Sequence, residues 1–233
     1  MKRIAVLTGA GVSAESGIAT FRDANGLWEN HRVEDVASPE GFRRDPALVL
    51  EFYNQRRAQL HTVKPNVGHK LIAALEDEYQ VTVITQNIDD LHERAGSTDI
   101  IHLHGELLKA RPVGTGGPIL DWPGDIKVGD THEDGRQLRP HIVWFGEDVP
   151  EIVNAAGIVS QADLVLIVGT SMQVYPAAGL VGYAPDHAPV VYIDPKPTIS
   201  YELERRRDIH TIELGGSEGM EVARDLIRKL LGI

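Results

Sequence analysis

The sequence predicts an α/β fold in which a doubly wound parallel sheet carries a small inserted module and a helical segment. Short apolar, β-branched segments alternate with helical ones, an alternation typical of parallel sheets covered by helices on both faces. Glycine or polar residues directly follow the apolar segments. They stand at residues 9–17, 85–89, 104–105, 169–171 and 194. Because ligands bind at the carboxyl ends of parallel strands, these positions predict a site along one edge of a Rossmann-like sheet.

The expected strands are short apolar runs. They span residues 4–8, 81–85, 100–103, 163–168 and 190–193. The expected helices follow from apolar periodicity, with Pro46 at a first helical position and Gly96 at a helix end. They span residues 46–62, 66–79, 89–95, 147–161 and 219–231.

The chain of 233 residues is expected to form one domain with three parts. The large part, about 1–30, 80–106 and 139–233, should build the sheet. A helical insert should span about 31–79. Residues 107–138 are rich in glycine and proline, polar and poorly periodic, which predicts a small cysteine-free module.

Composition excludes several classes of protein. The net charge of −11 argues against nucleic acid and suits a basic peptide, although such a charge more often serves solubility. The absence of cysteine excludes disulfides and thiolate metal sites and is consistent with a reducing cytoplasm. No apolar run approaches the roughly 20 residues of a membrane span. The first residues resemble a short signal peptide, but cleavage would remove the glycine-rich segment, so we interpret them as a buried strand.

The glycine-rich segment 9–17 predicts a phosphate-binding turn. Gly9 and Gly11 would let the backbone approach a pyrophosphate with its N–H groups, and Gly9-x-Gly11-x-x-Ala14 formally matches the dinucleotide pattern. A dehydrogenase would also need an acidic residue at the end of a second strand about 20 positions on, and no strand is expected there. The motif therefore favours a dinucleotide but not hydride transfer. The alternative is a glycine turn that only packs a strand against a helix.

Gln86, Asn87 and Asp89 place two amides and a carboxylate within one turn after an expected strand. Such groups can hold a carboxamide and a ribose while positive charge develops on the sugar. Asp89 and Asp90 alone could equally mark the start of a helix. That alternative explains neither of the two amides.

Two histidines, His102 and His104, would share one face of the next strand. A histidine on a strand is more often structural than catalytic. His104 is the better candidate for a general base because Gly105 follows it and frees its approach. We interpret His102 as structural.

Together these motifs resemble those of the sirtuins, the NAD-dependent protein-lysine deacylases. The resemblance runs nearly end to end. Its segments are 9–17, 85–89, 102–105, 139–146 and 169–171, in this order. It implies a single sirtuin-type catalytic domain, NAD as the cofactor and acylated lysine side chains of proteins as partners. It also implies that the acyl oxygen attacks the ribose carbon as nicotinamide leaves, and that His104 then deprotonates a ribose hydroxyl, giving O-acyl-ADP-ribose.

The resemblance assigns roles in the cofactor site. By it, Asn87 and Asp89 orient the nicotinamide and ribose, and Gln86 contacts a ribose hydroxyl. Phe21 would shield the reacting carbon, and Arg22 would reach the phosphates. His104 and Asn87 form the expected catalytic set. The expected cofactor-binding residues are Gly9, Ala10, Gly11, Glu15, Ala19, Phe21, Arg22, Trp28, Gln86, Asn87, Ile88, Asp89, Gly169, Thr170, Ser171 and Asp194.

At the adenosine end, Gly169, Thr170 and Ser171 are small enough for close approach of a ribose or adenine. Asp194 stands near the position where the family usually has an asparagine that holds the adenosine ribose. A carboxylate could accept the same hydrogen bonds from the hydroxyls, although the match is looser.

Arg56 stands in an apolar stripe of its expected helix, formed with Val49, Tyr53 and Leu60 at spacings of four, three and four. On periodicity alone, such an arginine reaches solvent from the stripe's edge or pairs with a structural carboxylate. Its neighbour Arg57 is expected to point elsewhere. However, Tyr-x-x-Arg on this helix resembles the sirtuin branch that removes succinyl and malonyl groups. There the pair binds the acyl carboxylate, which suits a planar guanidinium.

The segment 139–147 resembles the one that pairs with the substrate peptide in sirtuins; alone it would indicate a buried strand leading into a helix. By resemblance, the backbone of Val143 contacts the acyl-lysine amide, and Phe145 and Gly146 line the peptide cleft. The expected substrate-binding residues are Tyr53, Arg56, Val143, Trp144, Phe145 and Gly146.

Most sirtuins bind one structural zinc through four cysteines in the region equivalent to 107–138. This chain has none, and His132 with Glu133 and Asp134 offers too few ligands, so no zinc and no other metal is expected. The module would then be held by apolar side chains alone. These are Leu107, Leu108, Ile119, Leu120, Trp122, Ile126 and Leu138.

The sequence thus predicts a cytoplasmic, NAD-dependent protein-lysine deacylase that removes succinyl, malonyl and acetyl groups, without nucleic-acid or membrane partners. One alternative is an NAD-consuming ADP-ribosyltransferase or NAD hydrolase, in which the pair of Tyr53 and Arg56 would have no role. Another is a non-catalytic NAD-sensing module, against which His104 argues. A dehydrogenase is the most distant alternative, because the second-strand acid is missing.

Overall fold

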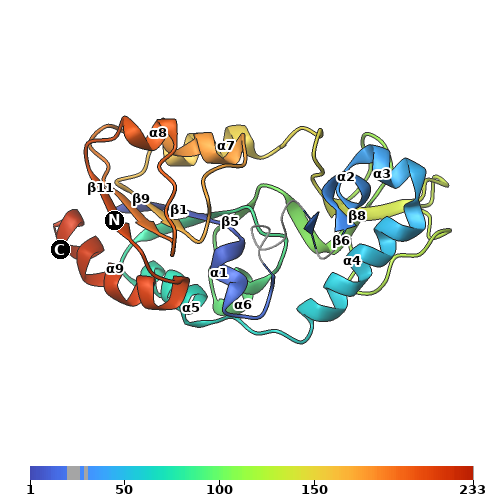
Figure 1. Cartoon of the computed structure of the whole chain (residues 1–233), viewed down its shortest axis with the longest axis horizontal. Coiled ribbons are helices and arrows are strands. Elements are labelled where there is room, and N and C mark those ends of the chain that lie inside the picture. Colours follow the sequence, from blue (N-terminus) through green and yellow to red (C-terminus); the bar gives the residue numbers. More distant parts are fainter. Residues whose placement is uncertain (20–26, 29–30, 233) are drawn as a thin grey trace.

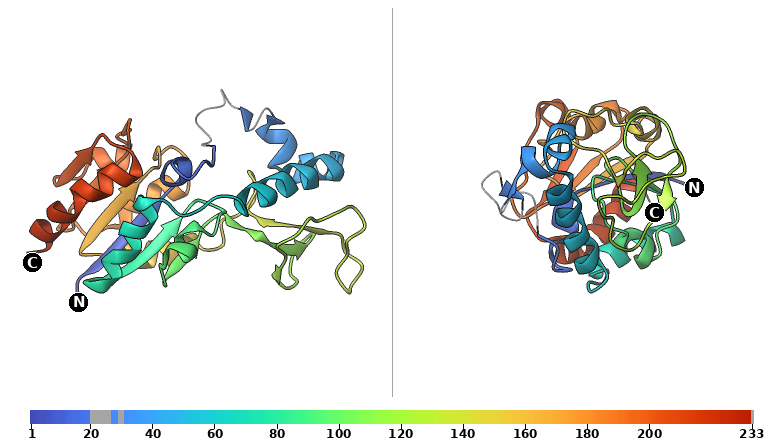
Figure 2. Two further views of the ribbon diagram at one scale, coloured as in Figure 1. Left: turned by 90° about the horizontal axis from the view of Figure 1, so that it is seen from below. Right: turned by 90° about the vertical axis from the view of Figure 1, so that its right-hand side faces the viewer.

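The computed structural model describes residues 1–19, 27–28 and 31–232, and it contains a six-stranded parallel sheet that leads at one end into a smaller part (Figures 1 and 2). In spatial order the strands are β11 (Ile209–Ile212), β10 (Val190–Ile193), β9 (Leu164–Val168), β1 (Arg3–Thr8), β4 (Gln80–Thr85) and β5 (Ile100–His102). Each strand pairs in parallel with its neighbours. The predicted doubly wound sheet is confirmed, with one strand, β11, that the sequence analysis missed.

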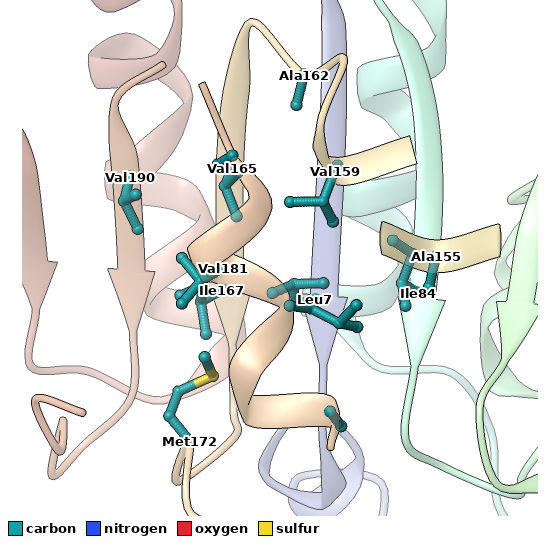
Figure 3. Packing of buried hydrophobic residues seen from close by; sticks show 14 of the residues in the cluster. Leu7, Ile84, Ala155, Val159, Ala162, Val165, Ile167, Met172, Val181 and Val190 are labelled. Atoms are coloured by element: carbon teal, nitrogen blue, oxygen red, sulfur yellow. The ribbon is translucent and has the colours of Figure 1, made fainter. Parts of the chain in front are cut away.

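Helices cover both faces of this sheet. One face carries α5 (Val67–Ala74), its 3₁₀ continuation η2 (Leu75–Asp77) and α9 (Gly216–Leu231). The other carries α7 (Ile152–Val159), the 3₁₀ helix η3 (Ala177–Tyr183) and α8 (Tyr201–Glu204). Strand β9 is buried throughout, so Val165 and Ile167 face α7 and η3 (Figure 3), while Leu164 and Leu166 face α9. A continuous apolar run is expected of a strand buried on both faces.

The smaller part is built on a three-stranded antiparallel sheet in the order β7 (Leu120–Asp121), β6 (Gly105–Pro112) and β8 (Leu138–Ile142). Its helices are α2 (Val33–Val36), α3 (Pro39–Arg44) and α4 (Pro46–Leu60), and β2 (Leu27–Trp28) pairs with β3 (His31–Arg32). A third apolar cluster joins α4 to β6 and β8. The remaining helices, α1 (Ala10–Ala14) and α6 (Leu91–Ala95), follow β1 and β4.

Local chemistry sets the ends of several helices. Asp45 accepts a hydrogen bond from the N–H of Leu48 at 3.0 Å, and Pro46 begins α4 as predicted. Asn66 caps α5 by accepting from the N–H of His69 at 3.3 Å. Gly96 ends α6 with φ +107°, which glycine adopts without strain.

Two expected boundaries are corrected. The helix expected at 147–161 begins only at Ile152, because Pro150 cannot donate inside a helix and disfavours helical geometry in the residue before it. The insert expected at 31–79 divides between two places: α2, α3 and α4 belong to the smaller part, whereas α5 packs against α9 on the large sheet. Ile72 and Leu75 are buried there. Within the described residues, no helix is both long and apolar enough to cross a membrane.

Candidate active site

The loops after β1 and β9 meet where the strand order of the sheet reverses, the usual place for a ligand in such sheets. The N–H of Gly11 donates to the carbonyl of Gly169 at 2.8 Å, and the N–H of Gly9 donates to that of Val168 at 3.2 Å. A Cβ at Gly11 would lie 2.7 Å from the Cα of Gly169, so this close approach requires glycine. The expectation that both N–H groups point at a pyrophosphate is therefore corrected: both are used between the loops, as in the packing alternative.

The loop after β4 reaches both of these loops. The Gln86 side-chain amide donates to the hydroxyl of Thr170 at 2.9 Å. The Asn87 amide donates to the carbonyl of Gly9 at 3.2 Å and to the hydroxyl of Ser13 at 3.1 Å. The structure thus brings together three segments that the sequence analysis selected separately.

Asp89 is buried beside this junction. Its carboxylate accepts from the hydroxyl of Ser13 at 3.0 Å and from the N–H of Leu91 at 3.1 Å. Burial raises the pKa of Asp89, and these two hydrogen bonds act in the opposite direction. Leu91 begins α6, so Asp89 also serves the helix start that we weighed as the alternative.

A buried histidine lies behind Ser13 and was missed from the sequence. The Nδ1 of His69 accepts from the N–H of Asn66 at 3.4 Å, so the proton of the neutral ring is on Nε2, which lies 3.3 Å from the hydroxyl of Ser13. Burial lowers the pKa of His69 to about 4 and keeps the ring neutral. A chain of donors therefore runs from His69 through Ser13 to Asp89. The spacing of Asn66 and His69, which form a capping box, was the signal available in the sequence.

A second cluster of buried polar side chains lies at the ends of β1 and β4. The hydroxyl of Thr8 donates to that of Thr85 at 2.8 Å and contacts Nε2 of His92 at 3.0 Å. Burial lowers the pKa of His92 to about 3. The floor of the site is thus polar and internally hydrogen-bonded, which fixes the loops above it.

The tautomer of His104 is set by its surroundings. Its Nδ1 lies 3.0 Å from the carbonyl of Gln86, which can only accept, so Nδ1 carries the proton and Nε2 has a free lone pair. Burial lowers the pKa of His104, and the carbonyl of Gln86 acts in the opposite direction. A neutral imidazole with an unprotonated Nε2 is the form that a general base requires.

His102 has a different environment. Its Nε2 lies 2.6 Å from the carboxylate of Glu93, and its Nδ1 lies 3.3 Å from the carbonyl of Asn87. Burial disfavours the charged ring, but the hydrogen bond and charge of Glu93 outweigh burial and raise the pKa of His102. The two histidines thus hold consecutive carbonyls of one loop, with only His104 kept neutral.

The expected acyl-binding pair lies on α4. Tyr53 is fully buried, its hydroxyl accepts from the indole N–H of Trp144 at 3.0 Å, and burial raises its pKa. The guanidinium of Arg56 lies over the ring of Phe52, 3.4 Å from the ring centroid, and 5.9 Å from that of Trp28. The phenol is therefore turned into the core, while Arg56 is half-buried on an aromatic surface.

Arg57 corrects another expectation. It does not point away but is the most deeply buried arginine of α4, with 1% of its surface exposed. Its Nη1 donates to the side-chain carbonyl of Asn54 at 3.0 Å. Burial lowers the pKa of Arg57 to about 10. The stripe pattern missed it because the antiparallel sheet adds a second buried face to this helix.

The segment after β8 runs beside His104. The N–H of Val143 donates to the carbonyl of His104 at 2.9 Å, so this N–H is used within the protein. Trp144 is buried and supports Tyr53, whereas Phe145 is 52% exposed and Gly146 has φ +88°. Of the expected peptide-binding residues on this segment, Phe145 and Gly146 are exposed, Val143 is partly exposed and Trp144 is buried.

The opposite end of the site contains the expected adenosine residues. Thr170 and Asp194 are buried at the ends of adjacent strands, and Asp194 accepts from the N–H of Lys196 at 2.8 Å. Ser171 is partly exposed. Glu15 instead accepts from the N–H of Ser217 at 3.0 Å, at the start of α9, which gives it a structural contact.

The remaining expected cofactor residues are distributed as follows. Ala10 and Ile88 are partly buried beside the loops described above, and Ala19 is exposed. Trp28 packs edge-on against Phe52, with ring centroids 5.0 Å apart. Phe21 and Arg22 lie outside the described residues.

These groups fit a dinucleotide. Carboxylate, hydroxyl and amide groups of Asp194, Thr170 and Gln86 stand at the carboxyl ends of three strands, where ribose hydroxyls are held in such folds. The glycine contacts leave room for little besides backbone between the loops. At the other end, the neutral Nε2 of His104 can accept a proton. Fold and site together define an enzyme of the dinucleotide-binding α/β class.

Comparison with known proteins identifies the family. A model of the Sir2 family matches residues 9–176. The chain is 55% identical over 233 residues to an NAD-dependent protein deacylase of Bacteroides thetaiotaomicron, covering 97% of this chain and 98% of the relative. It is 50% identical over 231 residues to one of Helicobacter pylori strain J99, covering 99% and 96%. A solved Sir2 homolog–NAD complex is 36% identical, has a TM-score of 0.85 and matches 98% of this chain and 91% of its own.

The chain belongs to the Sir2 family, as the sequence motifs predicted. It lacks cysteine throughout, so the four-cysteine zinc site of most sirtuins is not available to it.

Proposed function

We propose that this enzyme is an NAD-dependent protein-lysine deacylase that removes succinyl and malonyl groups as well as acetyl groups. Its relatives, 50–57% identical over most of the chain, are NAD-dependent protein deacylases, and solved Sir2 neighbours are complexes with NAD or ADP-ribose. NAD is accordingly the cofactor. When bound, NAD would supply an activated ribose carbon for the acyl oxygen, and with one water the products would be free lysine, nicotinamide and O-acyl-ADP-ribose.

The observation that carries the proposal is the state of His104. Its Nδ1–H is held by the carbonyl of Gln86 at 3.0 Å, and burial keeps the ring neutral at neutral pH. Nε2 can then take a proton from a hydroxyl without first losing one of its own. Asn87 and Asp89, fixed by Ser13, would hold the nicotinamide end, and Gln86 with Thr170 would hold the ribose.

The preference for acidic acyl groups is supported by Arg56. Its guanidinium is half-buried on the rings of Phe52 and Trp28, and one of its N–H groups donates to the carbonyl of Phe52. A carboxylate would be bound more strongly on such a half-buried surface than in water. The hydroxyl of Tyr53 accepts from Trp144 and keeps a proton, because burial raises the tyrosine pKa, so it can donate to the same carboxylate after a small shift.

Replacing Arg56 by Met tests the acyl preference. With succinyl- and malonyl-lysine peptides, kcat/KM should fall at least about 100-fold, since a charge-assisted bidentate contact is lost. With acetyl-lysine peptide, it should change by less than about threefold. Arg43→Met is the matched control, because Arg43 is exposed on the neighbouring α3 and pairs with Glu40 at the surface. Equal losses on all three substrates would contradict the acidic preference.

The alternative, NAD cleavage with another acceptor, is separated by omitting the peptide. A deacylase should release nicotinamide slowly until an acyl-lysine peptide is added, because the peptide oxygen is the attacking group. His104→Ala should lower the rate of peptide-dependent product formation by about 10²–10⁴-fold. Rapid nicotinamide release without peptide would favour the hydrolase.

A further inference from the structure

A cavity of about 200 Å³ lies behind the loop that carries Gln86, Asn87 and Asp89. Its lining contains five carboxylate residues, one imidazole and one lysine, with two apolar side chains. The lining thus carries an excess of negative charge, and it shares Ile88 and Asp89 with the loop of the cofactor site. This charge favours a positively charged occupant.

Three of these side chains converge. Glu93 on α6, His102 at the end of β5 and Glu106 on β6 each offer a ligand atom, and the three atoms lie within 4.8 Å of one another. The imidazole Nε2 and the carboxylate of Glu93 are 2.6 Å apart. Two ligand atoms about 2 Å from one cation lie roughly 3–4 Å apart, so the imidazole and the Glu93 carboxylate would separate slightly and the most distant pair of atoms would move closer. Imidazole and carboxylate together suit a first-row divalent ion.

The other nitrogen of His102 supplies an independent argument. Its Nδ1 faces the carbonyl of Asn87 at 3.3 Å, so it is a donor. Histidines that bind metals usually donate their second N–H to a carbonyl or carboxylate, which fixes the ring and presents the first nitrogen to the ion. The ring itself is held on a paired strand, since His102 stands in register with Thr85 of β4.

We propose that Glu93, His102 and Glu106 bind one divalent transition-metal ion of the zinc class, with water at the remaining positions. This site lies where β5 of the large sheet meets β6 of the antiparallel sheet, and it uses no cysteine. The inference does not rest on the deacylase activity. Binding replaces the proton on Nε2 of His102: the ion enters, one proton leaves, and no oxidation or reduction takes place.

Without an ion, the same residues form two ion pairs, Glu93 with His102 and Glu106 with Lys109, whose Nζ lies 2.9 Å from Glu106. Lys109 therefore competes with the cation for Glu106. Replacing a ligand should weaken metal binding, whereas removing the charge of Lys109 should strengthen it because the competitor for Glu106 is gone. If the two salt bridges were purely structural, removing Lys109 would give no such gain.

Calorimetric titration of the full chain with Zn²⁺ tests the proposal, and Co²⁺ absorption provides a spectroscopic readout. We expect one ion per chain. His102→Gln and Glu106→Gln should each weaken binding at least tenfold and alter the Co²⁺ bands, and Lys109→Met should strengthen it severalfold. Affinity should fall as the pH falls, because the proton competes for His102. His210→Gln is the matched control: His210 forms a similar pair with Asp208, 2.7 Å apart, on the exposed edge strand β11.

Two outcomes would overturn the inference. One is stoichiometric binding that persists in both His102→Gln and Glu106→Gln but is lost in His132→Gln, which would move the ion to the turn of the module. The other is binding no tighter in the parent protein than in the two ligand variants. Circular dichroism of each variant checks whether the fold is retained, and Glu93→Gln provides a third ligand variant should one of the first two fail to fold.

Discussion

The six-stranded sheet and the cysteine-free module (residues 107–138) are stabilised by different interactions. The sheet lies between two apolar clusters, and its central strands β1 and β9 are buried on both faces. The module has few apolar side chains, and its strands β6 and β7 pair over only two positions. In the module, side chains bonded to backbone carbonyls and N–H groups do much of the work that apolar burial does in the sheet.

Arg136 illustrates these contacts between side chains and backbone. The guanidinium of Arg136 donates to the carbonyls of Val113, Thr115 and Gly116 at 3.1–3.2 Å, and it pairs with Asp134. The pair holds the pKa of Asp134 well below its usual range. These contacts close the turn without any metal ligand from cysteine, which the chain lacks.

The module is also tied to α4. The side-chain amide of Asn54 donates to the carbonyl of Ile126 at 2.9 Å and accepts from the N–H of Ile126 at the same distance. Ile126 is fully buried, whereas Ile119, expected in the module's core, is 54% exposed. The expectation that apolar side chains alone hold the module is therefore wrong: a buried asparagine joins it to the helix. Hydrogen bonds restrict the relative orientation of two groups more than apolar contacts do. They also cost more free energy when one partner is lost, because the other is left buried and unpaired.

The largest predicted effect concerns acid and affects the sheet. Burial lowers the pKa of His69 to about 4 and of His92 to about 3, from an ordinary value of 6.5. Both histidines are neutral in the folded chain at pH 5 but protonated when the chain is unfolded. Their contribution to the free energy of unfolding is therefore complete above pH 6.5 and is lost as the pH falls. Unfolding free energy from urea titrations should fall by about 3 kcal/mol between pH 7.5 and 5.

The pair of His102 and Glu93 has the opposite effect on the pH dependence of stability. The raised pKa of His102 adds stability below about pH 6.5 that is lost as the pH rises through its folded pKa, but Glu93 is 40% exposed and the gain is below about 1 kcal/mol.

His92→Gln should reduce the proton uptake on unfolding at pH 5 from about two to about one. If hydrogen exchange at pH 5 shows the module opening before the sheet, the sheet is not the acid-sensitive region.

How far the sequence predicts this structure depends on how local the cause is. Apolar strands, Pro46 at a helix start and Gly96 at a helix end depend on neighbours in the chain, and they were found within a few residues. The loops at 9–11, 86–89 and 169–171 were found because parallel strands bring their carboxyl ends to one edge.

What was missed depends on contacts across the fold. The roles of Ser13 and His69 require α5 to lie under the first loop, 56 residues away in the chain. Arg57 is buried beside Asn54, which bonds Ile126 of the module, 72 residues away in the chain. The apolar pattern of a single helix cannot indicate which second element will cover it, so these placements could not be derived from the sequence.

A smaller, local effect is expected from Asn54→Ala. It removes both bonds to Ile126 and the acceptor of Arg57, leaving buried polar groups without partners, which should cost about 2–3 kcal/mol. Amide exchange should accelerate at Ile126 and along β6 while β1 stays protected. Gln55→Ala is the matched control on the exposed side of α4, where the side chain donates to Glu51, and it should change stability by less than about 0.5 kcal/mol. Equal acceleration in both sheets would show that the module does not open by itself.

The smallest effect should come from Gln137→Ala. The side chain of Gln137 donates to the carbonyls of Lys127 and Leu138 at 2.9 and 3.0 Å and accepts from the N–H of Gly129 at 2.7 Å. It is only partly buried, so water can replace much of what is lost, and the expected cost is about 1 kcal/mol. The change should appear as faster exchange at Gly129 with an unaltered kcat on acyl-peptides, because this turn lies in the module and not in the loops around His104. A fall in kcat without loss of stability would mean that the turn orders the catalytic side of the sheet, and the separation between the two regions would not hold.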